Sequence, residues 1–146
     1  MDNKWDEYFM RIAREAASLS KDPSTQCGAV IVGPDRTIRG TGFNGFARGV
    51  RDDERLHDRE TKLRMIIHAE INAIIHARCD LRGCTIYVWP LPPCSMCAAC
   101  IIQAGISRVV APAPSVELVG RWREHFRLAS DMYCEVGVIY SEVGGE

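Results

Sequence analysis

One histidine and two closely spaced cysteines constrain this chain more than any other feature. His68 stands in the segment His-Ala-Glu, and Cys94 and Cys97 stand in the downstream segment Pro-Cys-Ser-Met-Cys. A catalytic zinc takes three protein ligands and keeps a fourth position for water. One imidazole and two thiolates supply that number. We therefore predict one Zn²⁺ per chain, bound by His68, Cys94 and Cys97.

Glu70 follows the histidine by two residues and is the predicted catalytic residue. Side chains two residues apart within a helix point about 200° apart, but at a helix's first turn both can border one cleft. Zinc lowers the pKa of bound water from about 16 towards about 7. A carboxylate next to the zinc can then act as the base for that water, which is the role we predict for Glu70.

The same residues at the same spacing are typical of zinc deaminases that act on nucleobases. A Cys-x-x-Cys pair also occurs in structural zinc sites and in redox-active dithiols. A structural zinc site normally has four protein ligands. A redox dithiol would need no His-x-Glu. The spacing therefore favours catalysis of the deaminase type.

Length and composition indicate one ordinary globular domain over residues 1–146. The chain is 47% hydrophobic and 25% charged, with a formal net charge of −1, which argues against a protein that coats nucleic acid. The N-terminal residues lack the apolar segment of a signal peptide, and no apolar run approaches the roughly 20 residues that cross a membrane. We expect a cytoplasmic protein without membrane contact.

The chain has seven cysteines, an odd number that does not suggest a disulfide framework. Cys27, Cys84 and Cys134 lie in or beside apolar segments and are expected to be small core residues. Cys79 and Cys100 have no partner at a spacing that supports a second metal.

Apolar periodicity predicts helices and strands in the order α-β-β-α-β-α-β-α-β. This order predicts a mixed sheet with helices on both faces. The two helices that begin at the metal ligands would place the site where open α/β sheets hold their ligands, beyond the carboxyl ends of strands. The expected helices are 4–20, 66–77, 95–103 and 116–132, and the expected strands are 27–32, 37–43, 84–89, 107–111 and 135–140; the tail from residue 142 is expected to fray.

A charged segment, residues 44–62, lies between the expected hairpin and the histidine helix. Its arginines and lysine alternate with acidic residues. The segment can therefore be a solvated surface of weak ion pairs. Alternatively, some of the cations bind a phosphate, for which the arginine fork and the lysine charge are suited. Arg48, Arg51 and Lys62 are the candidates.

Several segments together resemble the cytidine deaminase superfamily, and within it most closely the deoxycytidylate (dCMP) deaminase family. The resemblance rests on six blocks and covers nearly the whole chain, fading after Val110. These blocks are Ser20-Lys21-Asp22-Pro23, Gly42-Phe43-Asn44-Gly45, Thr61-Lys62, His68 to Ile74, Thr85 to Val88 and Pro93 to Cys97.

The resemblance implies a three-layer α/β/α sandwich with a five-stranded mixed sheet. It implies hydrolytic deamination of dCMP to dUMP and ammonia, which feeds thymidylate synthesis. It also implies a homo-oligomer, with dCTP and dTTP as possible effectors. Asn44 matches an asparagine that contacts the sugar, and Ala69 and Lys62 fall in matching blocks as further candidates for binding substrate.

The chain also departs from the family pattern. Some members carry a second zinc bound in the loop before the catalytic histidine, but this loop has His57 and no cysteine, so we predict a single zinc. Trp122 and Phe46 are candidates to stack on the pyrimidine. Trp89 ends a predicted strand and is expected in the core.

Other functions stay open at this point. Pro-Cys-Ser-Met-Cys followed by two alanines also resembles tRNA adenosine deaminases, and deaminases of guanine, of other free bases or of a modified cytosine nucleotide share the zinc motif. A zinc-stabilised scaffold or inactive regulatory subunit is the non-enzymatic alternative. Glu70 argues against it, because a scaffold needs no carboxylate beside an open zinc position.

Overall fold

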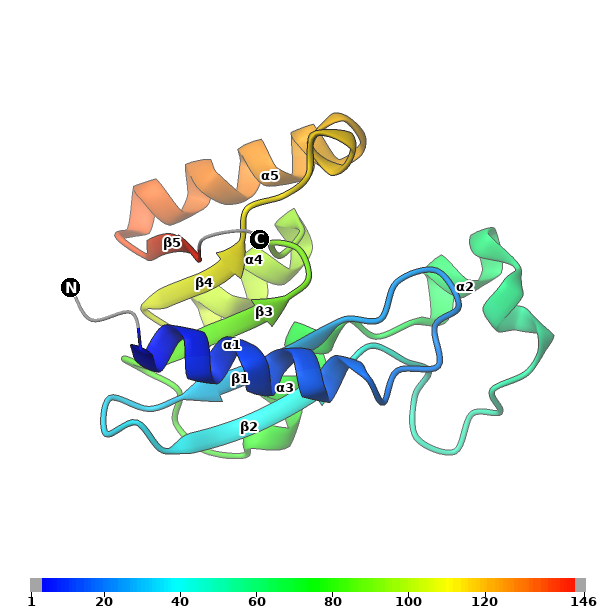
Figure 1. Ribbon diagram of the computed structural model, residues 1–146, viewed down its shortest axis with the longest axis horizontal. Helices are drawn as coiled ribbons and strands as arrows, with labels where there is room; N and C mark the ends of the chain where they lie inside the picture. Colours follow the sequence, from blue (N-terminus) through cyan, green and yellow to red (C-terminus); the bar gives the residue numbers. More distant parts are fainter. Residues whose placement is uncertain (1–3, 144–146) are drawn as a thin grey trace.

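A computed structural model describes residues 4–143 of the chain, in which one five-stranded sheet carries helices on both faces (Figure 1). The strand order is β2-β1-β3-β4-β5. The elements are α1 (Lys4–Ala17), β1 (Gly28–Val32), β2 (Ile38–Phe43), the 3₁₀ helix η1 (Glu54–His57), α2 (Arg59–Met65), α3 (Ala69–Ala77), β3 (Thr85–Trp89), α4 (Ser95–Gln103), β4 (Arg108–Pro112), α5 (Val116–Val136) and β5 (Ile139–Val143).

The sheet is mixed, as predicted. β1 pairs antiparallel with β2 and with β3, whereas β3, β4 and β5 run parallel. The hairpin of β1 and β2 needs only a short turn, while each parallel pair needs a crossover helix. α4 connects β3 to β4 and α5 connects β4 to β5. The predicted alternation of helices and strands therefore accounts for the topology.

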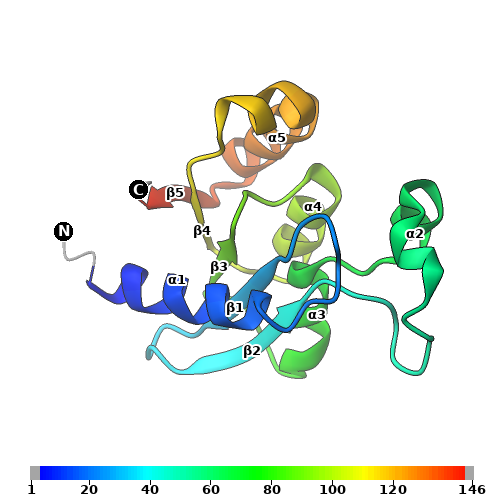
Figure 2. The same ribbon diagram turned by 45° about the vertical axis from the view of Figure 1, so that its right-hand side comes forward.

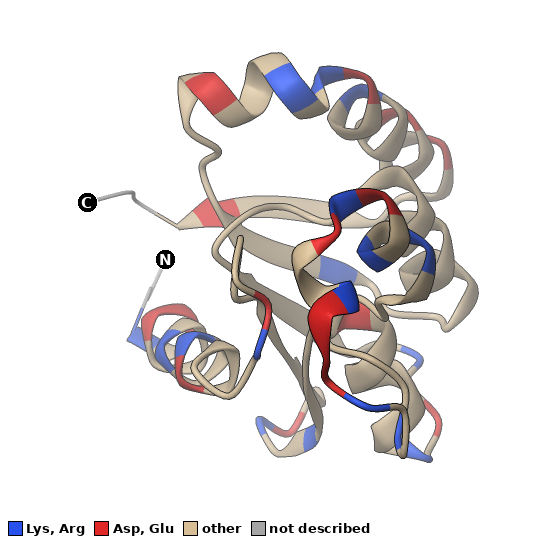
Figure 3. Ribbon diagram, turned by 90° about the vertical axis from the view of Figure 1, so that its right-hand side faces the viewer, with Lys and Arg blue, Asp and Glu red and all other residues tan. Residues whose placement is uncertain are grey.

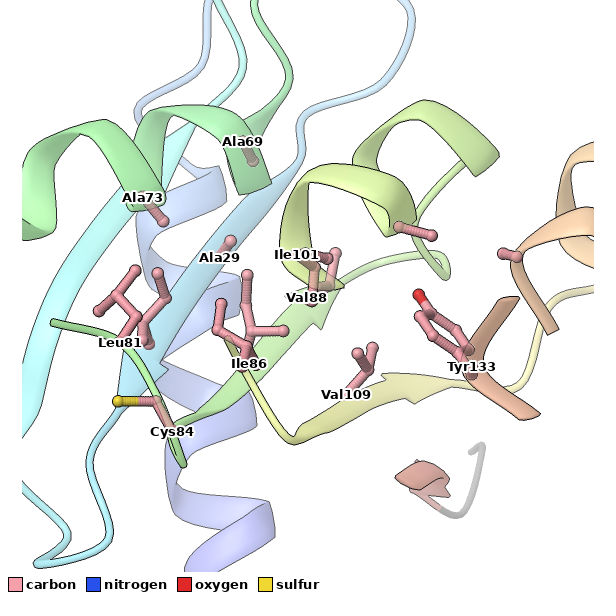
Figure 4. Packing of buried hydrophobic residues seen from close by; sticks show 14 residues of the cluster. Ala29, Ala69, Ala73, Leu81, Cys84, Ile86, Val88, Ile101, Val109 and Tyr133 are labelled. Atoms are coloured by element: carbon pink, nitrogen blue, oxygen red, sulfur yellow. The ribbon is translucent and has the colours of Figure 1, made fainter. Parts of the chain in front are cut away.

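Side chains that alternate along the central strands separate two cores. On one face, Val30 and Tyr87 pack with Phe9 of α1. On the other face, Ala29 and Ile86 belong to a larger cluster with residues of α3, α4 and α5 (Figure 4). This division produces the three-layer α/β/α sandwich. Each fully buried valine or isoleucine contributes roughly 1.5–3 kcal/mol through the hydrophobic effect.

Glycine in β2 lets α3 lie directly on the sheet. A Cβ added at Gly42 would stand 2.5 Å from the carbonyl oxygen of Ala69 and 2.4 Å from the amide nitrogen of Ala73. Any larger residue would push the first turn of α3 away from the strand. Because that turn follows His68, the glycine fixes the height of the predicted metal ligand above the sheet.

The element boundaries differ from the predicted ones mainly at helix ends. α1 ends at Ala17, before the predicted Ser20. α3 begins only at Ala69, because Ile67 is extended and forms a bridge with Gly45. α5 continues to Val136, so the prediction of a strand from residue 135 was wrong.

At the C-terminal end of α5, Gly137 has a φ of 83° and donates its N–H to the carbonyl of Tyr133, which is a usual helix C-cap. Residue 142, predicted to fray, belongs to β5, and residues 144–146 of the predicted tail lie outside the described part. No helix within residues 4–143 is both long and apolar enough to span a membrane.

The charged segment stands away from the sheet and carries η1 and α2 (Figure 2). Seen from its outer side, basic and acidic residues alternate along it (Figure 3). Arg55 pairs with Asp53 at 2.8 Å and Arg64 with Glu60 at 3.2 Å. The first pair is half-buried and the second is exposed, and the exposed pair supports the solvated-surface interpretation for part of the segment.

Asp6 joins α1 to two strands and provides a test of the packing. Its carboxylate accepts a hydrogen bond of 2.8 Å from Tyr87 Oη and two from Arg108, at 3.0 and 2.6 Å. Hydrogen bonds from Arg108 hold the pKa of Asp6 below its ordinary value, against the opposing effect of burial. The ionised carboxylate is therefore the form that stabilises the fold.

We predict that Asp6→Asn lowers the free energy of unfolding at pH 7 by about 1.5–3 kcal/mol, the usual contribution of hydrogen bonds to a charged group. The lowered pKa sets the sign of the pH dependence. The stabilisation is complete above the pKa of Asp6 in the unfolded chain, and it is lost as the pH falls through the lower pKa in the folded chain. Urea denaturation at several pH values measures both effects. Glu60→Gln, which breaks an exposed pair, is the control and should cost less than about 1 kcal/mol; equal losses in the two variants would contradict the prediction.

Candidate zinc site and substrate pocket

The three predicted metal ligands meet at the N-termini of two helices. His68 is the N-cap of α3, and Cys94 is the N-cap of α4, which places Cys97 in the first turn of α4. His68 Nδ1 lies 3.2 Å from Cys97 Sγ and 3.6 Å from Cys94 Sγ. Since the N-cap residue His68 is extended rather than helical, its side chain and that of Glu70 border the same pocket.

These distances fit a zinc ion. Zinc bonds of about 2.0 Å to nitrogen and 2.3 Å to sulfur, at a tetrahedral angle, put the nitrogen and sulfur about 3.5 Å apart. The three ligand atoms all lie within 4.8 Å of one another, and no other group of three or more histidine, cysteine or acidic residues in the described chain satisfies this criterion. The donor set of one imidazole and two thiols is also one that zinc prefers.

The electrostatics of the two cysteines favour a cation between them. A hydrogen bond from Cys97 is the main cause that lowers the pKa of Cys94 to about 4, and His68 adds to the effect. The same hydrogen bond, together with burial, raises the pKa of Cys97. Without a metal, Cys94 is therefore the thiolate, and it accepts a hydrogen bond from the protonated thiol of Cys97. A bound dication deprotonates a coordinating thiol, so both cysteines can be thiolates when the metal is present.

Glu70 lies in the first turn of α3 and is only 6% exposed. Burial raises the pKa of its carboxyl to about 7, while its backbone hydrogen bond and the charge of His68 oppose the shift. A carboxyl with a pKa near neutrality can both accept and donate a proton at physiological pH. Glu70 thus has the properties of a general acid and base beside the metal position.

A pocket of about 300 Å³ opens over these residues. Among the predicted substrate-binding residues, Asn44, Lys62, Ala69 and Trp122 line it together with His68, Glu70 and Cys94. Arg48 and Arg51 are exposed and do not line it. The pocket contains two arginines that the sequence analysis did not select, Arg59 of α2 and Arg121 of α5.

Lys62 is buried in an ion pair. Its Nζ lies 3.0 Å from Asp22 Oδ1 and 3.2 Å from Ser24 Oγ, and the side chains of Lys62 and Asp22 are 5% and 6% exposed. The solvated-surface interpretation therefore fails for this lysine. Because an ammonium has three donors, one remains for a ligand in the pocket.

Asn44 follows β2 and holds the loop of residues 22–27 at one side of the pocket. Its Nδ2 donates to the carbonyl of Thr25 at 2.9 Å and to Asp22 Oδ2 at 3.3 Å, and its Oδ1 accepts from the amide of Cys27 at 2.9 Å. Both amide donors are thus used within the protein. Its predicted contact with a sugar stays a prediction; the structure shows in addition that Asn44 shapes the loop that holds Asp22.

Of the three aromatic residues considered for the pyrimidine site, one lines the pocket and two do not. Trp122 borders the pocket. Trp89 is half-buried against the α1 side of the sheet with Arg14 over its ring at 5.1 Å, which agrees with its expected place in the core. Phe46 lies under the guanidinium of Arg55 at 6.0 Å and is not part of the pocket lining.

A buried carboxyl beside a three-ligand zinc site, in a five-stranded α/β/α sandwich, defines a zinc-dependent hydrolytic deaminase. The family model described as the cytidine and deoxycytidylate deaminase zinc-binding region matches residues 3–113, and the chain belongs to this family.

Relatives of known sequence and structure agree with this assignment. An uncharacterized deaminase from the luxG 3′ region of Aliivibrio fischeri is 44% identical over 138 residues, which cover 94% of this chain and 92% of that protein. The human deoxycytidylate deaminase is 44% identical over 114 residues, covering 73% of this chain but only 64% of the human protein. The dCMP deaminase of cyanophage S-TIM5, solved with dCMP and dUMP, has a TM-score of 0.77 at 20% identity over 98% of this chain and 99% of that one, which shows the shared fold.

We predict one equivalent of zinc per chain, lost in Cys94→Ser and in Cys97→Ser. Zinc that binds only the folded protein stabilises the folded state. Both variants should therefore also unfold at a lower temperature than the zinc-loaded wild type. Elemental analysis and thermal denaturation measure these two effects. Cys100→Ser, an exposed cysteine in the same helix, is the matched control and should keep its zinc. Two equivalents of zinc in the wild type would contradict the single site.

Proposed function

We propose that this chain is a zinc-dependent aminohydrolase that converts dCMP and water to dUMP and ammonia. The observation that carries the proposal is a pocket lined by Glu70, by the predicted zinc ligands His68 and Cys94, and by the cations Lys62, Arg59 and Arg121. Cys97 lies beside the other two ligands. The relatives named deoxycytidylate deaminases support the choice of substrate.

When bound, zinc supplies an acidified water for attack at the amino-bearing carbon of the ring. Glu70 lies in the first turn of α3 and borders the same pocket as His68 and Cys94, so it would take one proton from the attacking water and deliver it to ring N3. It would then pass the second proton of that water to the departing amine, which leaves as ammonia. Burial of Glu70 excludes bulk water from these transfers.

The phosphate of the nucleotide requires directed cations. Lys62 has one remaining donor at the pocket, and Arg59 and Arg121 approach it from two different helices, α2 and α5. We therefore assign the phosphate to these three residues. Arg48 and Arg51, favoured by their positions in the sequence, do not line the pocket and stay the alternative.

The proposal extends to the setting of the enzyme. We propose a cytoplasmic enzyme, and the family resemblance implies that its product dUMP supplies thymidylate synthesis. A homo-oligomer, and dCTP and dTTP as effectors, follow from the family resemblance. Light scattering with and without each nucleotide tests assembly, and initial rates with added dCTP or dTTP test regulation.

We predict that Glu70→Gln keeps its zinc and its fold while kcat falls by about 10²- to 10⁴-fold, the usual contribution of general acid–base catalysis. Glutamine has nearly the same shape as glutamate but cannot carry the proton. Ammonia release from dCMP measures the rate, and elemental analysis confirms that zinc is retained. Near-normal turnover in this variant would remove Glu70 from the mechanism and with it the proposed reaction.

We predict that the wild type prefers dCMP to deoxycytidine and that Arg59→Ala and Arg121→Ala each narrow this preference by about 10- to 150-fold in kcat/KM. This range corresponds to the roughly 1.5–3 kcal/mol of a hydrogen bond to a charged group. Arg48→Ala and Arg51→Ala are the matched comparison and should leave the preference unchanged. Lys62→Met is assayed together with its stability, because removal of one partner leaves Asp22 buried without its cation.

Two results would contradict these assignments in different ways. Equal activity on nucleoside and nucleotide would overturn dCMP as the substrate. A preference that is narrowed by the Arg48 and Arg51 variants, but not by those of Arg59 and Arg121, would keep the substrate and move the phosphate site to the surface of the charged segment.

A further inference from the structure

One wall of the pocket comes from α5, which lies beyond the part of the chain that the family model matches. Leu118, Arg121, Trp122 and Phe126 all line the pocket. Arg121 and Trp122 lie three and four residues after Leu118, and Phe126 lies four residues after Trp122, so all four side chains share one face of the helix. The first half of α5 therefore presents a continuous surface to whatever occupies the pocket.

The first half of α5 has no fully buried side chain that packs in the core. The buried residues of the helix are Ala129 and Tyr133, both in its second half, and they join the larger core cluster. Trp122 and Phe126 are only half-buried, and Val116 is 90% exposed. Hydrophobic burial therefore fixes the second half of the helix but does not fix the half that borders the pocket.

A polar contact between His125 and α4 lies between these two halves. His125 Nδ1 is 2.8 Å from Ser95 Oγ and 3.4 Å from the backbone nitrogen of Ser95. Since the backbone N–H can only donate, Nδ1 is the acceptor and the ring proton resides on Nε2. Ser95 is the first residue of α4, between the two zinc ligands Cys94 and Cys97.

The contact satisfies a helix end. The first amides of a helix have no partner inside it, and the side chain of the N-cap Cys94 makes no capping hydrogen bond. The imidazole of His125 supplies an acceptor there from a different helix. The same ring contacts the indole of Trp122, with ring centroids 5.2 Å apart. His125 therefore joins the metal-binding turn of α4 to the aromatic side chain at the pocket.

We propose that His125 is a positioning residue: through its hydrogen bond to Ser95 it holds the first half of α5 over the pocket and so sets Trp122 and Arg121 against the substrate. The part of this inference that concerns substrate rests on the proposed function. The predicted zinc ligands and Glu70 all lie at the starts of α3 and α4, and none of them is a hydrogen-bond partner of His125. Loss of the contact therefore weakens substrate binding and leaves the chemical step intact.

Two variants test the contact. His125→Phe keeps an aromatic ring beside Trp122 but has no acceptor, so it removes both hydrogen bonds. Ser95→Ala removes the hydroxyl donor and leaves only the longer hydrogen bond from the backbone N–H. We expect each to raise the KM for dCMP by about 2- to 12-fold, the range of one lost neutral hydrogen bond, with kcat within about twofold of the wild type and zinc unchanged. The double variant should be no worse than the more affected single variant, because both act on the same contact.

Two further variants complete the set. His125→Asn places an acceptor close to the position of Nδ1 and should restore the KM of the wild type. Asp131→Asn, on an exposed part of the same helix, is the control and should change neither constant.

Hydrogen–deuterium exchange of the segment 116–122 provides a readout that is independent of activity. We expect exchange there to be several-fold faster in His125→Phe than in the wild type, with the sheet unchanged. Unchanged exchange in this segment would overturn the tether, and faster exchange with an unchanged KM would overturn its role in binding. A fall in kcat or loss of zinc would also overturn the inference, because His125 would then act on the metal site.

The proposed function fails in a distinguishable way. A wild type that does not deaminate dCMP would overturn the substrate assignment, while the exchange experiment would still decide whether His125 holds α5 in place.

Discussion

The structure depends on bringing the N-termini of two helices close enough for their cap residues to share one ion. His68 and Cys94 stand at these ends, and each helix begins just after a segment that the sheet or a neighbouring loop holds extended. The close approach at Gly42 sets α3 on β2, and Ala98 and Ile101 bury α4 against the sheet. The packing of the two helices on the sheet therefore determines where the ligand side chains lie.

The chain predicts its metal centre well because the information is local. Cys94 and Cys97 are three residues apart at a helix start, and His68 and Glu70 are two apart, so their relative positions follow from one turn of backbone. The strands are predictable for a similar reason, since the apolar run of β1 is buried on both faces. The limits of α5 and β5 were less predictable, because apolar residues continue across Gly137 and the turn depends on that one residue.

The pocket was predicted less well because its residues come together only through the fold. Asp22 follows a predicted helix, and no sequence motif indicates its ion pair with Lys62, which is 40 residues away in the chain. Arg59 and Arg51 belong to the same charged segment, and only the course of the chain through η1 and α2 turns one of them to the pocket and leaves the other outside. Arg121 lies where the resemblance fades, so no motif pointed to it.

The ligands of the metal all fall between residues 68 and 97, whereas α5 and β5 come later in the chain. The entropy cost of closing a loop grows slowly with its length, and this loop is short compared with the whole chain. During synthesis, the ligands and the strands β1, β2 and β3 leave the ribosome before the helix that forms the last wall of the pocket. All the predicted ligands of the metal are thus synthesised before the helix whose first half completes the substrate pocket.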